Sequence, residues 1–464
     1  MAGAEPGAGS AATTLAHSLA EHEERLMSCV HCGFCLPACP TYVRLGDEAD
    51  SPRGRLYLMR AVVEGRLDPA SDAFQTHIDR CLGCRACEPV CPAGVEYGSL
   101  LEHAREAAVE ARPAGGAARA ILWLFARRKL LFALMALGRL LRATGIPALG
   151  ARFLPARLGR VRLGLGMLAS TRRGRSARNA ASSASSPEAG PGPAPSPPGR
   201  HSLAGTRVAV LNGCVQAGLL GHVNDATRRV IRANGMNVVD ASGQRCCGAL
   251  HAHGGDLEGA RRLARINIDA MLGAGAEIIA VNAAGCGAQL KDYGELLADD
   301  ERYARRAARV AGKARDISEI LAEAGPRRGA PLPLSVTWDA PCHLLHAQRV
   351  SEPPLQVLRA IPELELVPLP RADECCGGAG TYGITHPRLG GEIGADKVDA
   401  VVGTGASVVA TSNPGCMMQI GGGLRMRGAN VEACHPVALL DESYRAAGLY
   451  DASAHGSSGS RGGG

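Results

Sequence analysis

The sequence is poor in aromatic residues and has no uninterrupted apolar run of membrane-spanning length. Only 3% of its residues are aromatic, which argues against the base stacking of a nucleic-acid partner. The most apolar segment, 119–142, is interrupted by Arg127-Arg128-Lys129 and is then too short to span a bilayer. Residues 1–6 lack the basic and apolar regions of a secretion signal, so we expect a reducing compartment without disulfides.

Acidic residues are missing from one long stretch. No Asp or Glu occurs between Glu110 and Glu188, whereas fifteen Arg and Lys residues do. The remaining residues carry a net charge of −8, since the whole chain is +7 and this stretch is +15. A strongly basic insert therefore separates two mildly acidic regions.

The insert is predicted to contain a helix over residues 119–142. On a helical wheel, four of its arginines fall within an arc of about 120°. These are Arg127, Arg128, Arg139 and Arg142. Such a helix suits a membrane interface with the arginines facing anionic lipid, or a partner subunit, or packing against the core of the protein.

Cysteine is abundant, and eight of the 17 cysteines form two copies of one motif. The motif C-x2-C-x2-C-x3-C-P spans residues 29–40 and again residues 81–92. Thiolates at this spacing hold an iron–sulfur cluster, and the fourth cysteine of such a pair usually ligates the other cluster. Paired zinc sites are the alternative, although zinc has no use for the Cys-Pro ending. We predict two [4Fe–4S] clusters, the first held by Cys29, Cys32, Cys35 and Cys91 and the second by Cys81, Cys84, Cys87 and Cys39.

Eight further cysteines recur at a constant offset in the second half of the chain. In each copy a cysteine follows an apolar run, a Cys-Cys-Gly (CCG) triplet comes next, and a last cysteine follows another apolar run. The offsets of 128, 129, 129 and 130 residues indicate an internal duplication. The first copy holds Cys214, Cys246, Cys247 and Cys286, and the second holds Cys342, Cys375, Cys376 and Cys416. Cys434 has no counterpart, and we expect it to be structural.

Both copies are predicted to be α/β domains. Their β-branched runs, as at 208–211 and 334–338, alternate with helical segments such as 224–233, 257–272 and 391–402. Strands that alternate with helices form parallel sheets, in which the loops after the strands gather functional groups. Four cysteines should therefore converge in each repeat, where they would suit a further iron–sulfur cluster or a zinc ion.

The N-terminal region is predicted to be all-α. It shows no strand alternation, residues 14–28 look helical, and Ser51-Pro52 begins a helix that stops near Gly65. Arg53 and Arg55 on that helix would either lie near both clusters and raise their reduction potentials or belong to a solvated helix face. The fold class is thus α/β with an all-α N-terminal domain, a helical two-cluster ferredoxin domain followed by two duplicated CCG repeats.

We expect six segments along the chain. They are a ferredoxin-like domain at 14–111, a basic helical insert at 112–175, a flexible linker at 176–204, the first CCG repeat at 205–329, the second at 330–448, and a disordered tail at 449–464.

Several motifs together resemble the iron–sulfur subunit of glycolate oxidase (glycolate dehydrogenase). They are Cys-Val-His-Cys-Gly-Phe-Cys at 29–35, Pro40-Thr41-Tyr42, Ser51-Pro52-Arg53-Gly54-Arg55 and Cys-Cys-Gly-Gly-Ala-Gly-Thr-Tyr at 375–382. The resemblance runs from about residue 20 to 448. The motifs are shared by a broader group that includes iron–sulfur subunits of lactate utilisation, glycerol-3-phosphate dehydrogenase and heterodisulfide reductase.

The resemblance implies that an FAD-binding partner subunit oxidises glycolate to glyoxylate, beside a second flavoprotein-like subunit. This chain would then pass the electrons toward the quinone pool, in the cytoplasm and peripherally on the inner face of the cytoplasmic membrane. No Gly-x-Gly-x-x-Gly follows a predicted strand, so we expect the flavin step, and every catalytic residue for it, on a partner.

One departure from the broader group concerns the end of each CCG site. Heterodisulfide reductase-type repeats end in C-x2-C and supply five thiolates, whereas this chain has Gln289 and Gln419 at the last position. Four cysteines per repeat suffice for a conventional cluster or zinc and argue against disulfide-cleaving chemistry. A heterodisulfide-reductase-like catalytic subunit remains the alternative to an electron-transfer subunit. Four histidines near the CCG cysteines are candidates to supply or tune ligands, namely His251, His253, His343 and His346.

Overall fold

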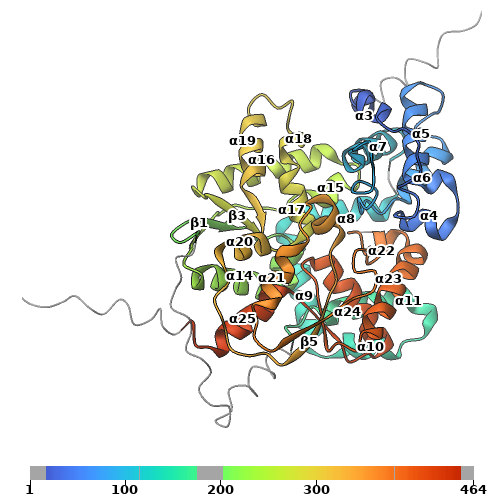
Figure 1. Cartoon of the computed structure of the whole chain (residues 1–464). Helices are drawn as coiled ribbons and strands as arrows, with labels where there is room; N and C mark the ends of the chain where they lie inside the picture. Colours follow the sequence, from blue (N-terminus) through green and yellow to red (C-terminus); the bar gives the residue numbers. More distant parts are fainter. Residues whose placement is uncertain (1–16, 114, 175–201, 381, 451–464) are drawn as a thin grey trace, which may run out of the picture.

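The computed structural model describes residues 17–113, 115–174, 202–380 and 382–450 (Figure 1). A helical N-terminal domain is followed by a helical insert and two α/β repeats. The expected linker and most of the expected C-terminal tail lie outside the described residues.

The N-terminal domain is built from short helices, with no strand among its described residues 17–113. These helices are α2 (His17–Ala20), α3 (Glu23–Met27), α4 (Pro40–Leu45), α5 (Pro52–Val63), α6 (Asp72–Asp79) and α7 (Tyr97–Ala111), with a 3-10 turn η1 (Glu48–Asp50). Ser51 caps α5 as predicted, because its hydroxyl accepts a hydrogen bond from the Gly54 N–H at 2.9 Å. The helix ends at Val63, and Gly65 adopts a φ of 69° just beyond it.

Residues 115–174 of the insert form four helices, and the prediction of one helix over 119–142 is wrong. The helices are α8 (Gly116–Ala126), α9 (Arg128–Ala143), α10 (Ile146–Phe153) and α11 (Gly159–Ser170), with a 3-10 turn η2 (Ala156–Leu158). The break falls at Arg127, whose φ of −99° and ψ of 79° are not helical. Its guanidinium stacks over the Trp123 ring, 3.8 Å from the ring centre. The turn at Arg127 lets α9 lie against the first repeat.

The inner face of α9 carries arginines as well as apolar residues. Leu131 and Met135 are buried, and a Cβ on Gly218 would lie only 1.9 Å from the Met135 sulfur. Arg139 donates to the Gly218 carbonyl at 2.6 Å, and Arg142 donates to the Leu219 carbonyl at 3.3 Å. Of the alternatives that the sequence left open, packing against the protein therefore holds for Arg139 and Arg142, because they satisfy carbonyls at the end of a short helix of the first repeat.

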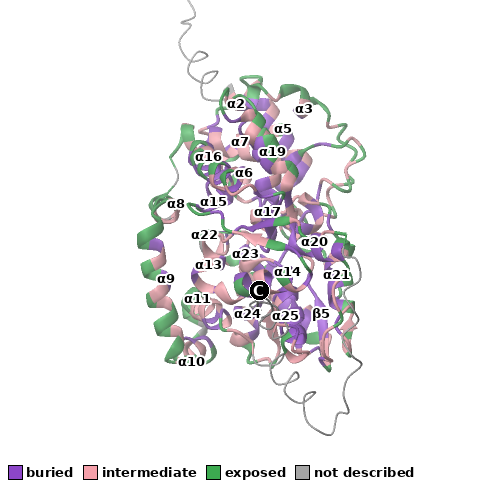
Figure 2. Ribbon diagram, turned by 90° about the vertical axis from the view of Figure 1, so that its left-hand side faces the viewer, coloured by how far each residue is buried: buried purple, intermediate pink, exposed green. Residues whose placement is uncertain are grey.

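The outer face of the insert carries exposed apolar residues beside its basic ones. Leu137, Leu140 and Phe153 are 62%, 69% and 73% exposed, and α9 and α10 line one edge of the molecule in Figure 2. Within the described residues, no single helix is long and apolar enough to cross a membrane. Taken together, α9 and α10 have the length and apolar composition of a membrane span, but they are bent by 75° at the break between them.

Each repeat contains a four-stranded parallel sheet. The first is formed by β1 (Arg207–Val210), β2 (Asn237–Val239), β3 (Ile278–Val281) and β4 (Ala314–Asp316), and the second by β5 (Leu334–Trp338), β6 (Leu364–Val367), β7 (Val408–Ala410) and β8 (Glu432–Cys434). The strand orders are β2-β1-β3-β4 and β6-β5-β7-β8. This identical topology agrees with the predicted duplication, and the fold class predicted from the sequence is confirmed.

Helices surround the two sheets. The first repeat holds α13 (Val215–Leu219), α14 (Gly221–Ala233), α15 (Ala249–Ala252), α16 (Leu257–Gly273), α17 (Ala284–Lys291), α18 (Tyr293–Leu296), α19 (Ala304–Lys313) and α20 (Ile317–Ala324). The second holds a π-helical turn η3 (His343–Ala347), α21 (Glu352–Arg359), α22 (Tyr382–Thr385), α23 (Pro387–Gly403), α24 (Pro414–Arg427) and α25 (Pro436–Ala446).

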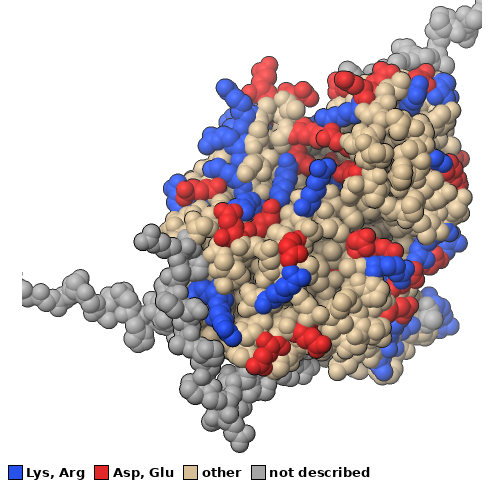
Figure 3. Space-filling model, viewed as in Figure 1, with Lys and Arg blue, Asp and Glu red and all other residues tan. Residues whose placement is uncertain are grey.

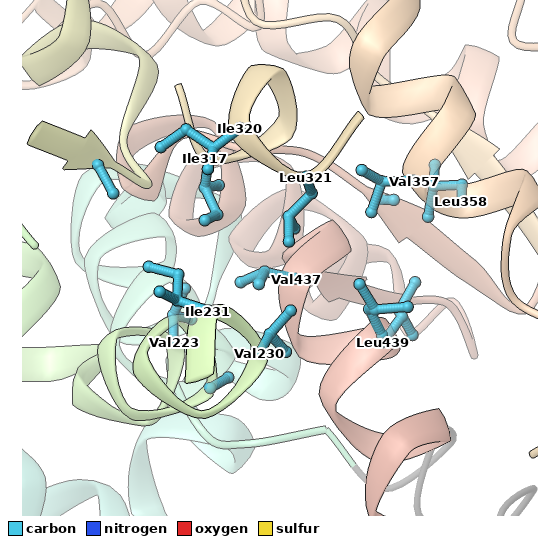
Figure 4. Packing of buried hydrophobic residues seen from close by; sticks show 14 of the residues in the cluster. Val223, Val230, Ile231, Ile317, Ile320, Leu321, Val357, Leu358, Val437 and Leu439 are labelled. Carbon is cyan, nitrogen blue, oxygen red and sulfur yellow. The ribbon is translucent and has the colours of Figure 1, made fainter. Parts of the chain in front are cut away.

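The two repeats share one apolar core. Helices α14 and α20 of the first repeat meet α21 and α25 of the second (Figure 4). Val230, Ile320, Val357 and Leu439 are at most 1% exposed in this cluster. Since burial of apolar area is the main stabilising term, the repeats should fold as one unit and hold their cysteine sites at a fixed separation.

His435 also joins the repeats and should make stability depend on pH. Its Nδ1 accepts from the Val437 N–H at 3.1 Å, and its Nε2 donates to the Asn282 carbonyl of the first repeat at 3.1 Å. Burial lowers the pKa of His435 from 6.5 to about 3, so the folded ring is neutral. The stability that depends on this neutral ring is present above pH 6.5 and is lost as the pH falls toward 3, because the unfolded chain takes up the proton first.

A His435→Asn variant tests this pH dependence, since Asn can still cap α25. Between pH 7.5 and 5.5 we expect the free energy of unfolding to fall by about 1.4 kcal/mol more in the unchanged protein than in the variant. Urea unfolding followed by circular dichroism measures both. His222, whose pKa burial lowers to about 4, is present in both proteins and cancels. Equal losses of stability would contradict the assignment.

Candidate metal centres

The two ferredoxin motifs fold into loops of the same shape. Each loop has positive φ at its third and fifth residues, which are His31 and Gly33 in the first and Gly83 and Arg85 in the second. Glycine stands at one of these positions in each loop, where the left-handed conformation has the lowest cost. The repeated conformation curls each run of cysteines around a common centre.

Two small cavities receive these cysteines, and each is lined by both motifs. The first has a volume of about 30 Å³ and the second about 20 Å³. Cys29, Cys32, Cys35, Cys87 and Cys91 line the first cavity, and Cys39, Cys81, Cys84 and Cys87 line the second. Each thus contains a predicted ligand set, with Cys87 touching both, and Cys39 and Cys91 cross to the cavity of the other motif.

Arg55 lies beside the second cavity and is fully buried, which the sequence did not indicate. Its guanidinium donates to Thr41 Oγ1 at 3.1 Å and pairs with Asp50 Oδ1 at 3.1 Å, and its Nη1 lies 3.9 Å from Cys39 Sγ. Burial opposes ionisation of Cys81, but Arg55 and Arg105 outweigh it and lower the pKa of that thiol. A fixed positive charge therefore favours the thiolate of Cys81, whereas burial raises the pKa of Cys84 and Cys87 in the same cavity.

Arg53 occupies a different environment from Arg55. Its Nη1 donates to the His31 carbonyl at 3.0 Å, and its Nε pairs with Glu48 at 2.6 Å. Arg53 thus braces the first cysteine loop, and its charge is shared with an exposed carboxylate. The expectation that both arginines raise the cluster potentials stays a prediction, with Arg55 the better placed of the two.

The four cysteines of each repeat converge on one point. Cys247 Sγ lies 3.2 Å from Cys286 Sγ, and Cys376 Sγ lies 3.2 Å from Cys416 Sγ. Hydrogen bonds between neighbouring thiols lower the pKa of Cys246, which Cys214 and Cys247 flank, and of Cys376, which Cys375 and Cys416 flank. Each site therefore combines four thiols with a preferred site of ionisation, and this donor set fits a metal or cluster.

Steric constraints explain the glycine of each CCG triplet. Gly248 and Gly377 have φ of 97° and 76°. A Cβ on Gly248 would lie 3.3 Å from the Ala260 backbone, and one on Gly377 would lie 2.3 Å from the Gly390 carbonyl oxygen. Only glycine allows the turn after the cysteine pair to pass so close to α16 and α23.

The second repeat adds a buried ion pair beside its cysteines. Lys397 Nζ lies 3.1 Å from Asp339 Oδ1, and both side chains are only 2% exposed. Lys397 also contributes to lowering the pKa of Cys376. Sequence reasoning missed this pair, although a lysine within the apolar face of a helix could have suggested it.

The histidines near the CCG cysteines have different environments. His343 Nδ1 lies 3.5 Å from Cys342 Sγ at the start of the π-helical turn η3. His346 Nε2 bonds to the Asp373 carbonyl at 3.1 Å, and His253 Nδ1 bonds to Glu102 at 3.0 Å, away from the cysteines of its own repeat. His251 is buried, and its Nε2 lies 4.0 Å from Asp256. His343 therefore lies beside a CCG thiol, and His251 is close enough to contribute to lowering the pKa of Cys246.

Three of the four cysteine sites follow one another through short contacts. Cys84 of the second cavity and Cys342 of the second repeat pack against the same apolar cluster. Burial raises the pKa of Cys84 most, and the neighbouring Cys342 raises it further. Asn413 then links the two repeats, because its Nδ2 lies 3.5 Å from Cys416 Sγ while its Oδ1 accepts from the Gly285 N–H at 3.2 Å. Gly285 directly precedes Cys286 of the first repeat.

Two family models match this chain. One, described as a 4Fe-4S dicluster domain, matches residues 25–95, and the other, described as a cysteine-rich domain, matches residues 208–291 and 336–421. The fold and the thiol sites thus define an iron–sulfur protein with a helical ferredoxin domain and a duplicated cysteine-rich domain.

Curated relatives narrow the class. The “Probable glycolate oxidase iron-sulfur subunit” of Bacillus subtilis is 34% identical, over 91% of this chain and 94% of the relative. The glycolate oxidase iron–sulfur subunit of Escherichia coli is 35% identical over 86% and 91%. Lactate utilization protein A of Shouchella clausii is 29% identical over 47% of this chain and 92% of the relative. The chain belongs to the family of glycolate oxidase iron–sulfur subunits.

Proposed function

We propose that this chain relays electrons within a glycolate-oxidising complex. An FAD-binding partner, assisted by a second flavoprotein-like subunit, oxidises glycolate to glyoxylate, and the electrons pass through this chain toward quinone. The observation that carries the proposal is the continuity of the cysteine sites, from the ferredoxin domain through Cys84 and Cys342 to Asn413 and the first repeat.

We assign the ligands of the ferredoxin clusters as the motif spacing suggests. The two small cavities support the assignment, because each draws its fourth cysteine from the opposite motif. The first [4Fe–4S] cluster is held by Cys29, Cys32, Cys35 and Cys91, and the second by Cys81, Cys84, Cys87 and Cys39. A bound iron–sulfur cluster accepts and donates one electron at a time, which suits a connection between two-electron carriers.

The CCG sites are proposed to hold a further iron–sulfur cluster or zinc in each repeat. Replacing Cys376 by serine removes the central thiol of the second site, and we expect the metal content of the anaerobically purified protein to fall by the amount that one site holds. Cys434→Ser is the matched control, since Cys434 Sγ bonds only to the neighbouring His435 carbonyl, at 3.7 Å. Iron and zinc analysis measures both variants. Unchanged metal content in Cys376→Ser would show that the site holds none.

The insert is proposed to hold the complex on the inner face of the cytoplasmic membrane. Its exposed leucines and Phe153 form an apolar surface, and no acidic residue occurs in the insert to repel anionic lipid. On the face of the molecule in Figure 3, by contrast, acidic and basic side chains are interspersed. Exposed Arg127 and Arg128 lie at the start of α9, where they can meet lipid headgroups.

Anaerobic capture of the chain from native extract tests the proposed function. The captured complex is assayed for dye reduction with glycolate, D-lactate, L-lactate and glycerol 3-phosphate. We expect glycolate turnover with a co-purifying flavoprotein. Preference for lactate would favour a second candidate function, an iron–sulfur subunit of a lactate-oxidising complex. The similarity to lactate utilization protein A supports that candidate. Absence of both flavoprotein and turnover would contradict the relay.

A further inference from the structure

A cavity of about 260 Å³ lies between the turn from α8 to α9 and the first CCG site. We propose that it binds the head group of a quinone, the acceptor of the electrons that this chain relays. This inference rests on the proposed function and assigns the place where the relay ends.

The cavity has an apolar wall and a thiol wall. Phe125, Leu131 and Phe132 of the insert line it on one side, and Cys214 and Cys246 of the first repeat also face it. Apolar and aromatic side chains are the usual lining for a flat organic ring, and this volume suits one substituted ring better than a larger ligand. A ring bound here would lie directly beside two of the four thiols of the first CCG site.

Polar groups suited to the carbonyl oxygens of a quinone line the same cavity. Arg128 and Arg245 are both exposed to solvent and both belong to the lining. A guanidinium has several N–H donors and no acceptor, so it matches the two carbonyl oxygens of a quinone and the hydroxylate of a reduced one. The lining thus combines apolar area with a few hydrogen-bond donors, as small-molecule sites do.

The cavity lies beneath the exposed apolar face of the insert. Leu131 and Phe132 line it, while Leu130, Leu134 and Leu137 on the same helix are 40%, 46% and 62% exposed. A quinone is confined to the membrane by its lipid tail, so its site must open where the protein meets lipid. The helix that carries this surface thus shares one cavity with Cys214 and Cys246 of the first CCG site.

The order of the cysteine sites also places the acceptor here. The second CCG site adjoins the ferredoxin domain through Cys84, and Asn413 links it to the first CCG site. The first site is therefore the far end of the series. The balanced reaction takes two electrons, delivered singly, and two protons from solvent to convert one quinone to one quinol, matching the two electrons released per hydroxy acid oxidised.

An Ala217→Trp variant tests the site, since Ala217 lines the cavity and a bulky side chain there would fill it. In the assembled complex, the ratio of short-chain quinone reduction to water-soluble dye reduction should fall roughly tenfold or more. Ala143→Trp, at an exposed alanine of α9 that does not line the cavity, is the control and should keep the ratio. An unchanged ratio in Ala217→Trp would overturn the site while leaving the relay intact. If the unsubstituted complex does not reduce the dye with glycolate, that result would instead contradict the proposed function.

A binding measurement without turnover completes the test. Illumination of the oxidised full-length chain with an azidoquinone should label peptides that contain residues 125–132, and excess unlabelled quinone should compete. Arg128→Ala, at an exposed residue that should not disturb folding, is expected to reduce this labelling. Labelling confined to other segments, or equal labelling of this variant, would contradict the proposal.

Discussion

Replacing Cys84 by serine is expected to stop electron transfer from the partner flavin to any acceptor while glycolate still reduces the flavin. Cys84 lines the second cavity of the ferredoxin domain and packs in one apolar cluster with Cys342 of the second repeat. Loss of a residue that only supports a metal ligand typically lowers activity by roughly 10–100-fold. Removal of the ligand itself should therefore lower the rate of quinone reduction by at least that factor. Stopped-flow absorbance of the anaerobic complex measures flavin bleaching, and a quinone assay measures turnover.

The control for Cys84 is Cys434→Ser, which removes a thiol outside the four cysteine sites and should leave both rates unchanged. Flavin that no longer bleaches in Cys84→Ser would show that this chain takes part in substrate oxidation itself. Normal turnover in Cys84→Ser would show that electrons bypass the second cavity. Either result contradicts the relay.

Arg55→Leu is expected to destabilise the ferredoxin domain by roughly 3–5 kcal/mol, because it leaves the buried carboxylate of Asp50 without its fully buried partner. Arg55 and Asp50 are both fully buried, and their closest approach is 3.1 Å. Arg80 and His77 also approach Asp50, at 2.9 and 3.1 Å, but both are partly exposed. The midpoint and slope of urea unfolding, followed by circular dichroism under anaerobic conditions, give the change in free energy.

Arg60→Leu is the matched control for Arg55. Arg60 pairs with Glu64 at 2.5 Å on the exposed face of the same helix α5, and its loss should cost only about 0.3–0.5 kcal/mol. Arg55→Lys, which keeps a charge but not the fork of donors, should lie between the two. Equal stability of Arg55→Leu and Arg60→Leu would mean that the buried ion pair adds nothing to folding.

Local signals in the sequence were sufficient for much of the fold. The cysteine offsets predicted a duplication, and the two sheets have the same strand order. Ser51 and Pro52 predicted the start of α5, because capping depends on neighbours in the sequence alone. The motif spacing also predicted which cysteines gather, since a tight loop leaves few arrangements open; the cluster assignment itself stays a prediction.

Tertiary contacts decided the rest, and these cannot be read from periodicity. A helical wheel cannot show that Arg139 and Arg142 face the protein, because the carbonyls that they satisfy belong to α13, more than 70 residues away. Asn413 is an ordinary polar residue in the sequence, and only the packing of two repeats places it between Cys416 and Gly285.

Rapid-freeze electron paramagnetic resonance of the complex after mixing with glycolate tests the central claim most directly. The account predicts that iron–sulfur signals of this chain appear within a single turnover and decay when quinone is added. In the Cys84→Ser complex, iron–sulfur signals from the CCG sites should be absent. Reduced flavin with iron–sulfur signals that never appear, while quinone is still reduced, would contradict the account.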